Sequence, residues 1–421
     1  MNLKSVLSVV LLVLFTIVSR AYSDQIIYQP GPSEGKDMWW SSYYDYGSPY
    51  HVVNDSKLQV GGWGDSYYTF IQFNLNCLPK TADTAYLNLR AYPNGSSTLV
   101  SMQLWVSTTD WKEDMGWSGA LYGIYQYTTI VPTPGQWLHL DITGIYNKWK
   151  NGTWSNKGLI LTPVSTNNNS NFFYSSDFLD DPSLRPSLEV NYTPQANQPF
   201  KVCFPMRLPD QGVYTASISS VFDHSMGAIF TTDNKVVAYT GEMGNYQGHP
   251  NDPTCISQTS GAFSIGGQYT GASECGGKFY LSYDGHPGID YPVSLGTPVY
   301  ATADGKITLA ECPYKSSGQS CTGSGSGYGK LYIDHGNGFI TSYNHLSATA
   351  DGLIQGISVV KKGQLVGYSG QTSPYAVGPH LHLSIIKNGI YVDPYGWIGS
   401  GADPYSALHG GVQNINLWEQ Y

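Results

Sequence analysis

Glycine and proline are so dense in this chain that long helices have no room to form. Its 421 residues include 48 glycines and 24 prolines. In a helix interior, glycine costs about 1 kcal/mol relative to alanine, and proline costs about 3 kcal/mol. Charged residues make up only 12% of the chain and hydrophobic residues 41%, which is too apolar for a disordered protein. The composition therefore excludes a helical bundle and predicts a folded, β-rich protein.

The length of the chain limits the number of domains, and its net charge limits the class of partner. The chain is longer than the roughly 150 residues of one ordinary domain, so we expect two domains. The formal net charge is −9. A negatively charged protein repels polyanions through its overall field, so nucleic acid is not an expected partner. We expect a monomer.

The N-terminus has the pattern of an export signal. Lys4 precedes an apolar run from Val6 to Val18, and the small residues Ala21 and Ser23 occupy the −3 and −1 positions of a cleavage site. The run is shorter than the roughly 20 residues needed to span a bilayer. We therefore expect residues 1–23 to be a cleaved signal peptide. The mature protein would then be secreted, extracellular or periplasmic, with no membrane anchor.

The cysteines are six in number, and none of them forms a CxxC pair. In an oxidising compartment, an even number of cysteines favours disulfide bonds. Their connectivity cannot be deduced from sequence alone. The candidate pairs are Cys312 with Cys321, Cys255 with Cys275 and, by elimination, Cys77 with Cys203.

Hydrophobic residues alternate with polar ones through much of the region from about Gln25 to Tyr192. Alternation with a period of two is typical of half-buried strands. The clearest strands are expected at residues 85–91, 100–106 and 71–75. Short strands separated by Gly, Asn and Ser turns predict a β-sandwich.

One short helix interrupts these strands. Ile142, Ile145 and Trp149 have helical spacing, Asp141 is placed to cap the start, and Asn151-Gly152 is placed to end the helix.

The strand motifs of this region resemble those of the DNRLRE-type domain of secreted bacterial proteins. The resemblance implies a jelly-roll β-sandwich over residues 24–192, related to some carbohydrate-binding modules. The segments that carry it are Phe70-Ile71-Gln72-Phe73-Asn74-Leu75, Thr84-Ala85-Tyr86-Leu87-Asn88-Leu89, Asp141-Ile142-Thr143, Lys157-Gly158-Leu159-Ile160-Leu161 and Arg185-Pro186-Ser187-Leu188-Glu189-Val190.

An aromatic cluster near the start of this region has two readings. Its rings could stack on sugars and so bind cell-wall glycan, or they could pack against the sandwich. The cluster consists of Trp39, Trp40, Tyr43, Tyr44, Tyr46 and Tyr50.

The second half of the chain begins after a polar, proline-flanked linker at residues 193–200. Residues 201–277 are rich in turns and show no pattern of an independent core. We expect this lead-in to wrap around the domain that follows. That domain is expected at residues 278–400, with a C-terminal tail at 401–421.

Histidine and aspartate residues in the 278–400 region have the spacing of metal ligands. His286 and Asp290 are four residues apart, and His380 and His382 flank a single leucine. In an extended strand, residues i and i+2 point to the same side, so the two histidines can face one site. A hydrolytic zinc ion needs three N or O donors and an open fourth position. These four residues offer one donor more than the three that zinc needs. A fifth candidate, His345, lies in another strand-like segment.

The surroundings of these residues resemble the M23 family of zinc metallopeptidases, the lysostaphin- and LytM-like endopeptidases of bacterial cell walls. The matching segments are His286-Pro287-Gly288-Ile289-Asp290-Tyr291, Leu295-Gly296-Thr297-Pro298-Val299-Tyr300-Ala301, Ala303-Asp304-Gly305, Ile333-Asp334-His335-Gly336-Asn337-Gly338, Tyr343-Asn344-His345-Leu346-Ser347 and Gly378-Pro379-His380-Leu381-His382.

The resemblance assigns roles to five residues. It implies zinc as the cofactor, with His286, Asp290 and His382 as its ligands. It implies that His345 and His380 are the catalytic pair, which orients or deprotonates the attacking water and stabilises the tetrahedral intermediate. Which of the pair is the general base stays open.

The expected fold is all-β, with an N-terminal jelly-roll β-sandwich followed by an antiparallel β-sheet peptidase domain of the LytM/M23 type. The expected function is that of a secreted zinc endopeptidase acting on peptidoglycan peptides. The alternative is a non-catalytic cell-wall-binding or regulatory protein with a peptidase-like fold. Five histidines outside the candidate site are expected to be structural or exposed: His51, His139, His224, His249 and His335.

Overall fold

The computed structural model describes residues 23–42, 54–93, 99–114, 123–166, 168–194, 198–225, 235–241, 243–246, 256–257, 285–311, 329–372 and 378–419. Within these ranges the chain forms antiparallel sheets and two short α-helices, α1 (Thr143–Lys150) and α2 (Pro404–Leu408). No helix in this part of the chain is long and apolar enough to cross a membrane. The expectation of an all-β protein is confirmed. The signal peptide lies outside these ranges apart from its last residue, and the domain boundaries stay predictions.

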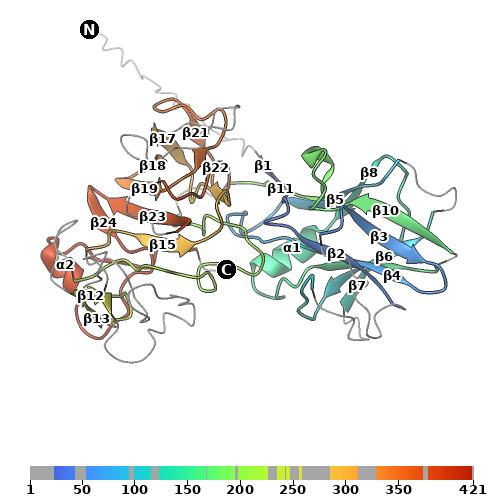
Figure 1. The fold of residues 1–421 in the computed structure, drawn as a ribbon, viewed down its shortest axis with the longest axis horizontal. Coiled ribbons are helices and arrows are strands. Elements are labelled where there is room, and N and C mark those ends of the chain that lie inside the picture. The colour runs from blue at the N-terminus through green and yellow to red at the C-terminus, as the bar shows by residue number, and fades with distance from the viewer. Residues whose placement is uncertain are drawn as a thin grey trace, which may run out of the picture.

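The N-terminal part contains two antiparallel sheets, drawn in blue to green at the right of Figure 1. The smaller sheet has the strand order β1 (Asp24–Tyr28), β11 (Ser187–Tyr192), β5 (Thr84–Arg90) and β8 (Trp137–Asp141). The larger has the order β10 (Asn169–Tyr174), β3 (Lys57–Gly62), β4 (Tyr67–Gln72), β9 (Leu159–Pro163), β6 (Met102–Ser107) and β7 (Gly123–Ile130), and β2 (Lys36–Ser41) also pairs with β4. A 3₁₀ turn, η1 (Pro182–Leu184), precedes β11.

Both sheets bury one face in a common core. Leu87 and Leu188 come from the smaller sheet, and Val60, Leu104 and Leu161 come from the larger one. Burial of such faces is the main favourable contribution to folding. The observed sheets therefore form a sandwich, while its jelly-roll connectivity and its DNRLRE relationship stay predictions.

The strand predictions differ in accuracy. β5 buries Leu87 and Leu89 completely, as the alternation predicted. The strand expected through residues 71–75 is wrong in its position, because β4 ends at Gln72. After that point the chain turns to the lead-in: the side chain of Asn74 donates to the carbonyls of Leu208 and Gln211.

Helix α1 is close to its prediction. It spans Thr143–Lys150, and Ile145 and Trp149 are buried. The cap residue is Ile142 rather than Asp141, but Oδ1 of Asp141 accepts a hydrogen bond from the amide of Thr143.

The C-terminal part contains three further sheets, in yellow to red at the left of Figure 1. The main sheet has the order β15 (Ile289–Pro292), β23 (His380–Lys387), β19 (Phe339–Asn344), β18 (Lys330–Gly336), β17 (Gly305–Glu311) and β21 (Val359–Val360), with β24 (Ile390–Val392) paired to β23. A small sheet consists of β16 (Pro298–Tyr300), β22 (Leu365–Tyr368) and β20 (Ala348–Thr349). Another consists of β12 (Lys235–Val237), β13 (Met243–Tyr246) and β14 (Ile256–Ser257).

The lead-in and the tail share one hydrophobic core with the main sheet. Phe204 and Phe222 of the lead-in, Trp418 of the tail, and Leu381 and Ile333 of the sheet belong to the same buried cluster. The backbone confirms this association, since Val202 and Trp418 form a parallel β-bridge. Three segments that are distant in sequence therefore build a single core.

The sandwich is fastened to the C-terminal part by a covalent bond and a buried cation. Cys77 forms a disulfide with Cys203, which is one of the three candidate pairs. The other four cysteines lie outside the described residues. The guanidinium of Arg207 is 4.6 Å from the ring centre of Tyr28 and 3.9 Å from that of Tyr300. Cation–π contacts strengthen when they are desolvated, so Arg207 links the sandwich core to the small sheet.

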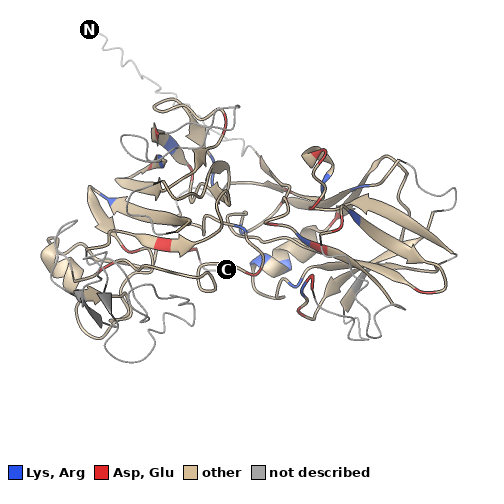
Figure 2. Ribbon diagram, in the orientation of Figure 1, with Lys and Arg blue, Asp and Glu red and all other residues tan. Residues whose placement is uncertain are grey.

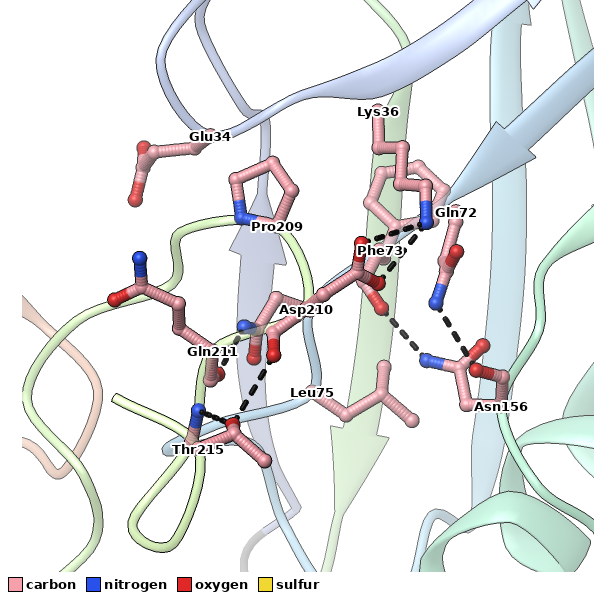
Figure 3. A pocket seen from close by; sticks show the side chains of 12 residues that line it. Glu34, Lys36, Gln72, Phe73, Leu75, Asn156, Pro209, Asp210, Gln211 and Thr215 are labelled. Atoms are coloured by element: carbon pink, nitrogen blue, oxygen red, sulfur yellow. Dashed lines mark hydrogen bonds and ion pairs between the residues drawn. The ribbon is translucent and has the colours of Figure 1, made fainter. Parts of the chain in front are cut away.

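A pocket of about 200 Å³ lies at the same contact, between the sandwich and the lead-in. Figure 3 shows the ion pair of Lys36 with Asp210 at 2.9 Å, and hydrogen bonds from the side chains of Gln72 and Asn156 to backbone carbonyls of the lining. None of the five candidate site residues lines it. Charged residues elsewhere are sparse and of mixed sign over the described chain (Figure 2), as the composition predicted.

Candidate metal centre

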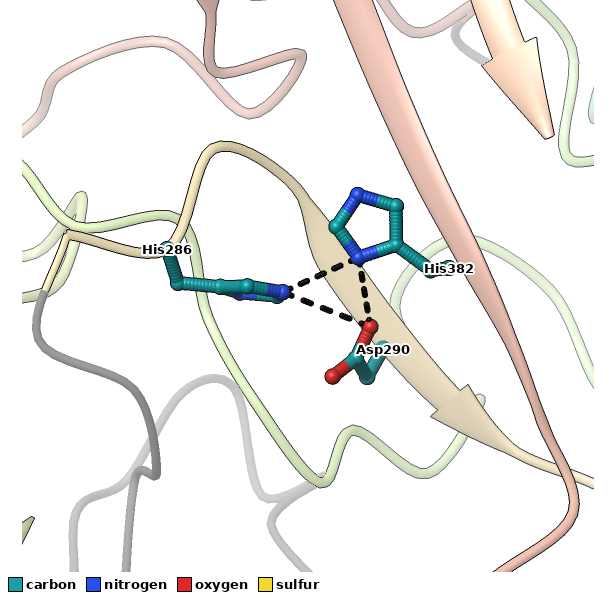
Figure 4. A group of neighbouring side chains, drawn as sticks. All are labelled: His286, Asp290 and His382. Carbon is teal, nitrogen blue, oxygen red and sulfur yellow. Dashed lines mark hydrogen bonds and ion pairs between the residues drawn. The ribbon is translucent and has the colours of Figure 1, made fainter. Parts of the chain in front are cut away.

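Strand pairing brings the predicted ligands together. β15 carries Asp290 and lies antiparallel to β23, in a register that places Asp290 opposite His382. His286 lies in the turn just before β15. Residues more than 90 positions apart in sequence therefore meet on two neighbouring strands (Figure 4).

The three side chains form a compact triangle of donor atoms. Nε2 of His286 is 3.0 Å from Nδ1 of His382, and that Nδ1 is 2.9 Å from Oδ1 of Asp290. Nε2 of His286 is 3.4 Å from the same carboxylate oxygen. All three residues are buried. Among the described residues, their ligand atoms lie within 4.8 Å of one another, which is close enough to hold one metal ion.

The donor set fits zinc. Zinc binds imidazole nitrogen and carboxylate oxygen at about 2.0–2.2 Å, with tetrahedral geometry. Tetrahedral ligands at that distance lie about 3.3 Å from one another, close to the 2.9–3.4 Å separations of this triangle. Zinc, the cofactor expected from the sequence, therefore matches both the chemistry and the spacing of these atoms.

Hydrogen bonds to the outer nitrogens orient both imidazoles. Nδ1 of His286 is 2.8 Å from the carbonyl oxygen of Val221. Nε2 of His382 is 2.7 Å from Oγ of Ser384. When the outer nitrogen of a ligating histidine donates its N–H, the inner nitrogen keeps its lone pair for the metal. Neither Val221 nor Ser384 was among the predicted site residues.

The cluster contains a buried negative charge. Burial alone raises the pKa of Asp290, but the imidazoles of His286 and His380 outweigh this and hold that pKa well below its usual range. Burial lowers the pKa of His286, and the Asp290 carboxylate reverses the shift, so the net direction is upward. Burial lowers the pKa of His382. An ionised carboxylate beside two imidazoles is an environment that favours a cation.

The second pair of histidines lies beside this triangle. His345 follows directly after β19, and its ring centre is 4.5 Å from that of His380 and 5.8 Å from that of His382. Nε2 of His380 is 3.8 Å from Oδ1 of Asp290, and its Nδ1 is 2.8 Å from the carbonyl of Gly378. The structure therefore brings all five predicted residues into one site.

His345 is half-buried and has two unusual properties. Its φ angle is 61°, a left-handed conformation that costs a non-glycine residue about 1–2 kcal/mol. Its Nδ1 is buried without a hydrogen-bond partner among the described residues. Burial, then the neighbouring His380 and His382, lowers the pKa of His345 to about 3. Strain and an unpaired polar atom of this kind concentrate at functional sites.

Three described histidines outside the site, His139, His224 and His335, have hydrogen-bond partners, as expected; His51 and His249 lie outside the described residues. Nδ1 of His335 is 2.7 Å from the carbonyl of Asp304, and Nδ1 of His139 is 2.7 Å from Oδ1 of Asn88. A signal for Ser384 was present in the sequence, because His380, His382 and Ser384 share the alternation of one strand face. Val221 had no such signal, because its contact uses a backbone carbonyl, a group that every residue has.

Comparison with known proteins covers the same region. Residues 284–394 match the model of Peptidase family M23. Over 110 residues the chain is 40% identical to the DD-carboxypeptidase/endopeptidase Mpg of Neisseria meningitidis, which covers 26% of this chain and 22% of that protein. Over 109 residues it is 37% identical to the peptidoglycan DD-endopeptidase ShyC of Vibrio cholerae, again covering 26% and 22%. The chain thus spans about 22% of the length of these curated relatives.

Among solved structures, the chain is similar to the catalytic domain of the antimicrobial peptidase lysostaphin from Staphylococcus simulans. The two are 30% identical, and the match covers 26% of this chain and 77% of that domain, with a TM-score of 0.21. The matched range 284–394 includes all five residues of the site described above. The C-terminal part of this chain therefore carries a peptidase M23 domain.

Proposed function

We propose that this protein is a secreted zinc endopeptidase that hydrolyses peptide bonds in bacterial cell-wall peptidoglycan. The observation that carries the proposal is the convergence of a buried His–Asp–His triangle with a second histidine pair. The similar relatives Mpg and ShyC carry the names of a DD-carboxypeptidase/endopeptidase and a peptidoglycan DD-endopeptidase, which supports peptidoglycan peptides as the substrate class. A non-catalytic relative would not need all five side chains.

The proposed ligands are His286, Asp290 and His382. When bound there, zinc acts as a Lewis acid that polarises a substrate carbonyl and makes a water molecule more acidic. The protein contributes a buried carboxylate and two imidazoles whose orientation is already fixed. Preorganised charge of this kind stabilises a transition state without reorganisation during the reaction.

The proposed catalytic pair is His345 and His380. Burial keeps His345 neutral, so it has one lone pair and one N–H available. Its unpaired Nδ1 can therefore exchange a hydrogen bond with a water molecule or a substrate group that enters the site. Nδ1 of His380 lies beside the Gly378 carbonyl, which directs Nε2 towards the Asp290 side of the site. The pair is placed to move protons at the reacting atoms.

Single substitutions separate metal binding from proton transfer. We expect His382→Ala to lose both zinc and activity. We expect His345→Ala to keep zinc and to lose about 10²–10⁴-fold in rate, the usual contribution of general acid–base catalysis. His139→Ala, on an exposed position of the sandwich, is the control and should match wild type. Each variant is measured for its zinc content and for its rate of cell-wall digestion. If metal-free wild-type protein digests cell walls as fast as the zinc-loaded protein, the proposal is wrong.

The scissile bond is identified by mass spectrometry of fragments released from purified peptidoglycan. Fragments cut within the peptide cross-links or bridges are the expected products. Release of sugar fragments alone would contradict an endopeptidase.

For the N-terminal sandwich we propose binding to cell-wall glycan. Trp40 is 4% exposed and packs on Phe70, so it belongs to the core. Trp63, outside the predicted cluster, is 54% exposed, and its ring centre is 6.1 Å from that of Tyr67. The tyrosines of the predicted cluster, Tyr43, Tyr44, Tyr46 and Tyr50, lie outside the described residues. Exposed rings of this kind can stack on sugars.

Binding of the full chain to purified peptidoglycan tests this proposal. Loss of one aromatic contact of about 0.5–1.5 kcal/mol corresponds to about 2- to 12-fold weaker binding, which we expect for Trp63→Ala. Tyr214→Ala removes an aromatic ring of similar exposure, 47%, from the lead-in and serves as the control. Equal binding by both variants would contradict a role for Trp63.

A further inference from the structure

The outer edge of strand β15 is covered by the lead-in. One edge of β15 pairs with β23, as described above. On the other edge, Ser220 and Asp290 form an antiparallel bridge. The amide of Ser219 donates to the carbonyl of Asp290 at 2.9 Å, and the amide of Asp290 donates to the carbonyl of Ser220 at 2.9 Å. The strand that carries a proposed ligand, Asp290, is therefore paired on both edges.

The same segment contacts the side chain of the preceding ligand. Nδ1 of His286 lies 2.8 Å from the carbonyl oxygen of Val221 and 3.1 Å from Oγ of Ser220. An acceptor at Nδ1 holds the proton on that nitrogen, which leaves Nε2 free of a proton on the side of the metal triangle. The lead-in thus selects both the tautomer and the ring orientation of His286.

Asp223 fixes the turn that carries His286. Its amide donates to the carbonyl of His286 at 3.0 Å, and its Oδ2 accepts from the amide of Gly285 at 2.9 Å. Its Oδ1 accepts from the amides of Ser225 and Val237, each at 2.9 Å. Asp223 is only 1% exposed, so a carboxylate with several donors is buried directly behind the turn. A buried acceptor is costly to leave unpaired, which makes this turn rigid.

The lead-in is itself anchored at several points away from the site. The disulfide at Cys203 ties it to the sandwich. His224 lies between the carboxylates of Asp393 and Asp403 in the C-terminal region. The segment lies outside residues 284–394, the range that matches the M23 family. Its contacts to the ligands are therefore a property of this chain rather than of the matched domain.

From these contacts we propose that Ser219–Asp223 forms part of the metal centre, and that Asp223 is a positioning residue for His286. The inference rests on the proposed zinc site and adds a support to it from outside the peptidase domain. Hydrogen-bond partners behind metal ligands typically change metal affinity about 10- to 100-fold when they are removed. Loss of the Asp223 contacts should have an effect of that size.

The test compares Asp223→Asn with Asp403→Asn in the full chain. Both replace a buried carboxylate by an amide of the same shape. The first removes an acceptor behind the His286 turn. The second weakens the anchor at His224 and the contacts of Asp403 with Tyr405 and Asn414, none of which touches the metal triangle. Zinc affinity is measured by competition with a chromophoric chelator, and thermal unfolding is recorded with and without zinc.

We expect Asp223→Asn to weaken zinc binding about 10- to 100-fold and to reduce the stabilisation that zinc provides. We expect Asp403→Asn to bind zinc within about threefold of wild type while lowering the melting temperature of the zinc-free protein. Wild-type affinity in Asp223→Asn overturns the inference. Equal weakening by both variants also overturns it, because general loosening would then explain the effect.

A second variant and the wild type complete the experiment. If Asp223→Asn does not fold, Ser220→Ala is used instead, because it removes the hydroxyl near Nδ1 of His286. We expect this variant to weaken zinc binding at least about threefold. Unchanged affinity overturns the inference. Absence of zinc binding in the wild type would instead refute the proposed metal site. The two failures are therefore distinguishable.

Discussion

His224 lies buried between two carboxylates, and this arrangement should make the stability of the protein depend on pH. Its Nδ1 is 2.8 Å from Oδ1 of Asp403 and its Nε2 is 3.0 Å from Oδ2 of Asp393. Burial alone lowers the pKa of His224, but the hydrogen bonds to the two carboxylates outweigh it and raise the pKa from 6.5 to about 9. An imidazole that donates from both nitrogens is protonated, so the geometry agrees with this direction.

The size of the effect follows from the shift. One pKa unit corresponds to about 1.4 kcal/mol. For His224, a rise from 6.5 to about 9 therefore contributes about 3 kcal/mol to the free energy of unfolding. Because the pKa is higher in the folded state, this contribution is present in full below pH 6.5 and is lost as the pH rises through about 9.

Replacing one carboxylate should remove part of this contribution. Two carboxylates share the interaction with His224, so Asp403→Asn should remove a sizeable part of it, on the order of 1–2 kcal/mol, while the imidazolium is present. At about pH 10 the imidazole is neutral in both proteins, and this part of the difference disappears. The destabilisation caused by Asp403→Asn should therefore be larger at pH 6 than at pH 10 by an amount on the order of 1–2 kcal/mol.

Urea unfolding of zinc-free wild type and Asp403→Asn at these two pH values provides the measurement. Zinc is removed because metal binding itself depends on pH. Comparing the two proteins cancels the titration of groups that the substitution does not touch. An equal difference at both pH values would contradict this prediction, because it would mean that His224 carries no charge in the folded protein.

Three further predictions concern the metal, a contact behind one of its ligands, and a contact between the sandwich and the small sheet. Removing zinc with a chelator should abolish cell-wall digestion, and zinc at about 100 times its dissociation constant should restore about 2.7 kcal/mol of stability in thermal unfolding; an unchanged melting temperature would speak against a folded-state zinc site. Ser384→Ala removes the hydroxyl 2.7 Å from Nε2 of His382 and should weaken zinc binding about 10- to 100-fold in a competition titration. Tyr300→Phe removes the hydroxyl that donates to both carboxylate oxygens of buried Glu34, and should lower the free energy of urea unfolding by about 1–3 kcal/mol.

The site residues could be predicted because two short spacings indicated metal ligands and the motifs around them resemble the M23 family, which also singled out His345. His286 and Asp290, and likewise His380 and His382, lie close enough in sequence for strand geometry to limit where they point. Composition also limited the fold, since dense glycine and proline exclude long helices. The alternation at Leu87 and Leu89 identified a buried strand face correctly, because burial on one face repeats every second residue.

The support behind the site could not be predicted in the same way. The contact of His286 with Val221 joins a side chain to a backbone carbonyl 65 residues away, and no residue type marks such an acceptor. The aromatic positions show the same limit. Trp40 is buried and Trp63 exposed, because the packing of neighbouring strands, rather than the presence of an aromatic residue, decides which ring faces water.

Composition alone predicts a β-rich chain, because glycine and proline act locally on the backbone. The resemblance of short motifs to the M23 family is what singled out five residues for a zinc site. How distant segments meet depends on the tertiary fold. The register of β15 and β23 places Asp290 opposite His382, and the lead-in holds the outer edge of β15 in place. Such contacts depend on the packing of the whole core, in which segments from the lead-in, the sheet and the tail are buried together.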